Sequence, residues 1–155
     1  MNWKKFLSRL DLLETPASFG LHPPGTPAQL HRLAAQFALV ELPAALEELY
    51  TQTNGITVST DGNGLDELVW SIEKVIEVNQ SYRANLDFKS LFMSFEQLLF
   101  ISASGNGDLF GFVTLQNSFE RQDIFVWNHE DDSRTWVAPS LTVFLEWRLK
   151  DKING

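Results

Sequence analysis

Four short apolar segments follow one another between residues 98 and 138, and this pattern constrains the fold more than any other. They cover 98–102, 109–115, 123–128 and 134–138. Asn106-Gly107 stands between the first two, and Asn-Gly is the strongest short-range hairpin signal because both residues tolerate positive φ. Connections this short join antiparallel neighbours. We therefore predict hairpins, with Asn106 and Gly107 as turn residues and Asp108 accepting hydrogen bonds from the turn amides.

Two details refine this prediction. The runs LLFI and IFVW are apolar at consecutive positions, which favours strands covered on both faces. Gly111 inside the second strand indicates a bulge or a close approach by an aromatic ring.

Helical patterns surround these strands. Apolar spacing predicts a helix over residues 3–13, followed by a Pro- and Gly-rich loop over 14–25. Thr26 starts a second helix, Gly55 supplies the left-handed residue that ends a third, and Ser71 caps a mid-chain helix. A last helix begins at Pro139-Ser140, short strands are predicted over 56–58 and 68–70, and residues 84–97 read as irregular. The order predicts an α+β fold: a mainly antiparallel sheet of about five to six strands with N-terminal, mid-chain and C-terminal helices.

Composition narrows the class of protein. The 155 residues suit one domain, and 12 Phe with five Trp provide a large core. The absence of cysteine excludes disulfides and thiolate sites. The first residues are too charged for a signal peptide, and no stretch reaches the ~18 apolar residues of a membrane span. We expect a cytoplasmic protein with no membrane contact.

Charge points to the kind of partner. The formal net charge of −8 disfavours nucleic acid, whose phosphates need clustered Lys and Arg. From Glu41 to Glu77 eight acidic residues accompany one basic residue, Lys74. Glu130, Asp131 and Asp132 add a second acidic group. Two interpretations stay open: an acidic patch for a basic protein, or turns and helix faces that are merely solvated.

Catalytic and cofactor motifs are not matched. The glycine spacing of 105–111 is one residue too long for a dinucleotide loop, and no helix start follows it. His129-Glu130-Asp131-Asp132 lacks the second histidine of a zinc-protease motif. We expect no cofactor and no enzymatic activity. The alternative from another class is a metal-dependent hydrolase using Asp108, His129 and Asp131.

Four segments together resemble a known family: LPAALEELYTQTNG (42–55), ELVWSIEKVIEVN (67–79), FISASGNGDLFGFV (100–113) and DIFVWNHEDDSRTWVAPSLTVFLEW (123–147). Their order is similar to that of the SUKH superfamily, which includes fungal cell-wall-synthesis regulators of the Smi/Knr type and many bacterial toxin-immunity proteins. The resemblance covers residues 26–149 of a single domain, 1–155, and leaves the N-terminal helix outside. It implies an α+β domain that binds proteins, and bacterial members typically neutralise a toxin, often a nuclease.

The combined prediction is an immunity protein, a monomer or weak dimer, that covers a basic toxin domain with an acidic face. The alternative within binding proteins is a regulatory scaffold with no toxin partner. Trp70 is the candidate anchor, although a large aromatic residue equally suits the core. The candidate residues of the acidic face are Asp61, Asp66, Glu67, Asp108, Glu130, Asp131 and Asp132.

Overall fold

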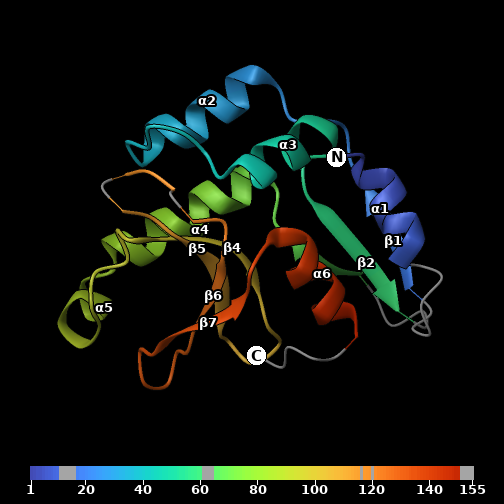
Figure 1. Ribbon diagram of the computed structural model, residues 1–155. Coiled ribbons are helices and arrows are strands. Elements are labelled where there is room, and N and C mark those ends of the chain that lie inside the picture. The colour runs from blue at the N-terminus through green and yellow to red at the C-terminus, as the bar shows by residue number, and fades with distance from the viewer. Residues whose placement is uncertain (11–16, 61–64, 116, 120, 151–155) are drawn as a thin grey trace.

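A computed structural model describes residues 1–10, 17–60, 65–115, 117–119 and 121–150 (Figure 1). Within these residues six helices and seven strands follow in the order α1 (Trp3–Leu10), β1 (Ala17–Leu21), α2 (Pro27–Gln36), α3 (Ala44–Gln52), β2 (Ile56–Thr60), β3 (Leu65–Val69), α4 (Ile72–Ala84), α5 (Leu86–Leu91), β4 (Leu98–Ala103), β5 (Leu109–Val113), β6 (Ile124–Trp127), β7 (Arg134–Ala138) and α6 (Leu141–Leu149).

The strands form two antiparallel sheets, one with the order β1-β2-β3 and one with the order β4-β5-β6-β7. Their neighbouring edges are connected where the Trp70 amide donates to the Ile101 carbonyl at 2.9 Å. The Ser102 hydroxyl donates to the Leu68 carbonyl at 2.8 Å beside it. The predicted α+β class is confirmed, while the described strands are more numerous than expected and divide into two sheets.

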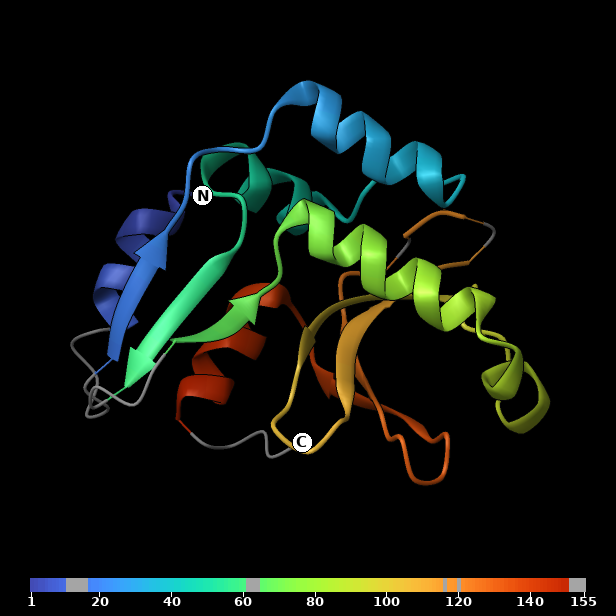
Figure 2. The same cartoon turned by 180° about the vertical axis from the view of Figure 1, so that it is seen from behind.

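The four-stranded sheet lies between α4 and α6, as the opposite views in Figures 1 and 2 show. On one face, Tyr82 of α4 contacts the rings of Phe100 and Trp127 at centroid distances of 5.8 and 5.7 Å. On the other, Phe110 packs against Phe144 of α6 at 5.0 Å. Double coverage explains why β4 is apolar at consecutive positions.

That explanation fails for β6, where the middle residues Phe125 and Val126 are only half-buried. The prediction of full coverage there was wrong, because β6 lies beside the edge strand β7, where Thr135 and Trp136 are themselves exposed.

The predicted helix starts are confirmed. Thr26 and Gln29 form a reciprocal capping box, with Thr26 Oγ1 accepting from the Gln29 amide at 3.1 Å and Gln29 Oε1 accepting from the Thr26 amide at 2.8 Å. Ser71 caps α4 through the Lys74 amide, and Ser140 caps α6 through the Val143 amide. These caps satisfy amides that have no partner within their helix.

The β4–β5 connection is the expected hairpin with two changes. Gly107 has φ +103°, but Asn106 is not among the described positive-φ residues. Asn106 Oδ1 accepts the Asp108 amide at 3.1 Å, so the turn acceptor is Asn106 and not Asp108. The bulge predicted from Gly111 lies opposite it, between Phe100 and Ser102 of β4. A Cβ at Gly111 would come within 2.2 Å of the Leu99 carbonyl oxygen, so the close approach is by backbone and not by a ring.

Two elements were missed. The predicted loop contains β1, which pairs with β2 through Phe19 opposite Val58 and neighbouring residues. The predicted irregular segment contains α5, whose first amides are capped by Asn85 Oδ1. Gly55 does adopt φ +98° between α3 and β2 as expected. None of the described helices is long and apolar enough to cross a membrane.

Candidate functional site

The acidic residues singled out from the sequence lie on separate parts of the molecule. Asp66 and Glu67 are consecutive in β3, so their side chains project to opposite faces of the strand. The β6–β7 connection lies at the far edge of the other sheet, beyond β4 and β5. Asp61 lies outside the described residues. The described residues therefore do not bring β3 and the β6–β7 connection into one acidic face.

Glu67 borders a cleft of about 400 Å³ lined by polar and apolar side chains, among them His22, Gln29, Asn54 and Thr57. Its polar groups largely bond one another or their neighbours. Asn54 and Gln29 both donate to the Glu73 carboxylate, and Glu67 pairs with Lys74 at 2.6 Å. The cleft lies between the segment that precedes α2, the α3–β2 connection and strands β2 and β3, and the Lys74 ion pair accounts for Glu67 without a ligand.

The β6–β7 connection, residues 128–133 and here called the tip, is fixed by Asp132. Its Oδ1 accepts from Trp127 Nε1 at 2.7 Å and from Arg134 Nη2 at 3.2 Å. Its Oδ2 accepts from the Met93 amide at 2.9 Å. Burial alone would raise the pKa of Asp132, but these hydrogen bonds and the charge of Arg134 outweigh it and lower that pKa. Asp132 therefore holds the tip against the segment after α5.

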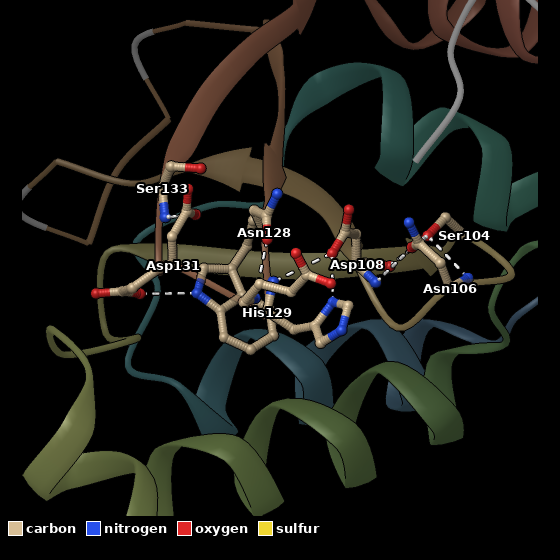
Figure 3. Close-up of polar contacts among 10 residues, drawn as sticks. Ser104, Asn106, Asp108, Asn128, His129, Asp131 and Ser133 are labelled. Atoms are coloured by element: carbon tan, nitrogen blue, oxygen red, sulfur yellow. Dashed lines mark hydrogen bonds and ion pairs between the residues drawn. The ribbon is translucent and has the colours of Figure 1, made fainter.

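Asp108 connects the β4–β5 turn to the tip, as Figure 3 shows. Its side chain lies in the interior, with a residue exposure of 6%, and Oδ1 accepts from the His129 amide at 3.1 Å. The same oxygen lies 2.6 Å from His129 Nδ1. Burial would raise the pKa of Asp108, but the contacts with His129 lower it overall. Asp108 is thus a brace between two hairpins, with little carboxylate surface left for a partner.

Glu130 and Asp131 are the exposed carboxylates of the tip. The Glu130 amide donates to Asn128 Oδ1 at 2.8 Å, and the Ser133 amide donates to Asp131 Oδ1 at 2.9 Å (Figure 3). Hydrogen bonding by Ser133 lowers the pKa of Asp131. Both residues thus belong to a turn whose backbone amides are hydrogen-bonded to side chains of the same turn.

Trp70, the candidate anchor, is packed in the core with an exposure of 3%. Its carbonyl accepts from the Tyr50 hydroxyl at 2.7 Å, and its amide helps connect the two sheets. The sequence left two roles open for Trp70, a partner anchor or a core residue. The structure shows the core role, so we omit Trp70 from the candidate surface.

The geometry gives no support to the hydrolase alternative. Among the residues that the structure describes, no group of three His, Cys, Asp or Glu side chains is placed to hold a metal ion. Asp108 is engaged with His129, while Asp131 is engaged with the Ser133 amide. We therefore derive no catalytic step from these residues.

Arg134 and Met93 belong to the site and were missed from the sequence. Arg134 donates to the Ser94 carbonyl at 2.8 Å and to the Met93 carbonyl at 2.9 Å. Its guanidinium also lies over the Phe95 ring, 5.2 Å from the centroid. These contacts span about 40 positions of sequence, so no local spacing signals them. The only hint was an Arg beginning a strand directly after an acidic turn.

The model of the SMI1 / KNR4 family (SUKH-1) matches residues 24–147. The chain belongs to this family. The predicted SUKH resemblance is confirmed over nearly the range expected, and the match includes both the Asp108–His129 contact and the tip. Helix α1 lies outside the SUKH match. No curated protein matches the chain.

Proposed function

We propose that this SUKH protein is an immunity protein, a non-enzymatic binder that covers a basic toxin domain with the β6–β7 tip. Membership of the family supports an immunity or regulatory role. The partner class is inferred from chemistry: a nuclease toxin needs a basic surface to hold nucleic acid phosphates. Glu130 and Asp131 present negative charge to such a surface.

The observation that carries this proposal is the preorganisation of the tip. Asp132 and Arg134 fix the tip to the residues after α5, and Asp108 fixes it to the β4–β5 turn. A binding loop that is already ordered loses less conformational entropy on association. Exposed charges on such a loop also raise the association rate with an oppositely charged partner.

Fewer acidic residues belong to the proposed binding face than the sequence alone suggests. The proposed face includes Glu130 and Asp131. Asp132 and Asp108 lie behind it and hold the tip in place through Trp127 and His129. Asp66 and Glu67 are left out because β3 lies beyond β4 and β5 from the tip. We propose a monomer or weak dimer that binds its toxin in the cytoplasm.

Co-expression with the protein encoded by the neighbouring upstream gene tests this function. If that protein arrests growth when expressed alone, we expect this chain to restore growth. We also expect the two to co-purify when the toxin carries an inactivating substitution. Growth arrest that persists beside a folded, abundant copy of this chain would contradict the proposal for that pair, and would favour a regulatory scaffold instead.

A further inference from the structure

Three large aliphatic side chains stand in solvent within eight residues around α5. Leu86 is 77% exposed, Leu91 is 72% exposed and Met93 is 64% exposed. They make up three of the eight exposed large apolar side chains among the described residues. Isolated exposed aliphatic residues are ordinary, but a concentration of them marks an interaction surface. Leu86 and Leu91 lie five positions apart in α5, so they face different sides of the helix. We therefore call only Leu91 and Met93, at the end of the segment that contacts the tip, the α5 patch.

The α5 patch rests on a rigid base. Phe88 and Phe92, which alternate with the exposed residues, turn inward and pack on Trp127 at centroid distances of 6.4 and 5.4 Å. Phe95 packs on the same indole at 5.2 Å. Phe95 is buried and Phe88 and Phe92 are half-buried against the core, whereas the aliphatic side chains of the same segment project into solvent.

The α5 patch is continuous with the acidic tip. The Met93 amide donates to Asp132, and the Met93 carbonyl accepts from Arg134. Both ribbon views place α5 beside the tip (Figures 1 and 2). The exposed charges on these two elements are mainly negative, with Asp87, Glu130 and Asp131 against Lys89. The combined surface has aliphatic side chains bordered by carboxylates.

We infer that the α5 patch is the apolar part of the binding surface, and that its occupant is a protein segment carrying aliphatic side chains bordered by Lys or Arg. That the partner is a toxin rests on the proposed function. The chemistry of its binding segment rests only on the exposed aliphatic side chains and the neighbouring carboxylates. Interfaces gain most of their affinity from a few buried apolar contacts, while charges at the rim set the association rate. Leu91 and Met93 anchor the partner, and Glu130 and Asp131 steer it.

A peptide titration tests the chemistry without any toxin. The probes are a synthetic peptide of alternating Lys and Leu and a matched peptide of alternating Glu and Leu, each added to the folded protein and followed by amide NMR. We expect the Lys/Leu peptide to shift the signals of residues 86–94 and 129–133, and the Glu/Leu peptide to shift them much less. Equal binding of both peptides, or shifts confined to other surfaces, would overturn the inference.

Variants then test the patch against the toxin. Leu91→Gln with Met93→Gln should raise the dissociation rate at least tenfold, the scale of a lost anchor. Val40→Gln, which changes an aliphatic residue that is 78% exposed on the connection before α3, is the matched control and should leave the rate unchanged. If the Leu91→Gln, Met93→Gln variant binds the toxin with an unchanged dissociation rate, the patch is not part of the interface, while the proposed function still stands. A sedimentation change on Leu91→Gln without toxin would assign the patch to a second copy, and would also overturn the inference.

Discussion

Gly111→Ala should lower the free energy of unfolding by about 4 kcal/mol, near the upper end for a single core substitution. The added Cβ would lie 2.2 Å from the Leu99 carbonyl oxygen and 2.9 Å from the Phe100 Cα. Both are backbone atoms of the paired strand, so no side-chain rotation relieves the overlap. β4 and β5 must separate at the bulge, which weakens their hydrogen bonds.

Urea denaturation followed by fluorescence measures this change, and Gly105→Ala is its control. A Cβ at Gly105 would meet nothing within 4 Å, so that variant should stay within about 0.5 kcal/mol of the wild type. Equal stability of the two variants would show that the β4–β5 pairing tolerates more separation than the structure indicates.

Asp132→Ala should cost about 3 kcal/mol of stability, because it removes the side chain that holds the tip in place. Under the function proposed above it should also weaken binding of the toxin. The substitution leaves Trp127 Nε1 and the Met93 amide without their acceptor, and Arg134 loses its carboxylate. Residue 132 also has φ +62°, which alanine adopts less readily than aspartate. Asp131→Ala is the control for the stability measurement alone, since the hydrogen bond described for that carboxylate is with the Ser133 amide of its own turn.

The contribution of Asp132 to the free energy of unfolding depends on pH. The pKa of Asp132 is lowered in the folded protein, so its contribution to stability is complete above the ordinary pKa of about 3.9. The contribution disappears as the pH falls through the lowered value, because the carboxylate then protonates. Asp132→Ala should therefore lose less stability than the wild type as the pH falls from about 5 to the acid limit of folding, as urea denaturation at a series of pH values would show. Identical acid profiles would mean that Asp132 does not brace the tip.

Local signals in the sequence were sufficient for much of the fold. Thr26, Ser71 and Ser140 cap the helices that they were expected to cap, because capping depends on residues three positions apart. The hairpin at Gly107 followed from turn chemistry. β1 could not be found in this way, since ASFGL has weak strand propensity and becomes a strand by pairing with β2.

The candidate site was less predictable than the fold. Acidic residues are visible in a sequence, but their exposure is decided by distant partners. Asp132 and Asp131 are neighbours, yet the first accepts from Met93 and Trp127 while the second faces solvent. Asp108 similarly turns from its own hairpin to His129 in the next. Leu91 and Met93 gave no signal, because exposed and buried apolar residues look alike in a sequence.

The proposed role of the tip is tested most directly by the association rate with the toxin that we propose as the partner, measured against salt concentration. Glu130→Gln with Asp131→Asn removes the two exposed charges of the tip and keeps the Asp132 brace. Glu41→Gln with Glu47→Gln removes two exposed charges near α3 and leaves the tip unchanged. We expect the first pair to slow association several-fold at low salt and to flatten its salt dependence, while the second pair has little effect. Equal rates and equal salt slopes for both pairs would show that the tip does not meet the toxin.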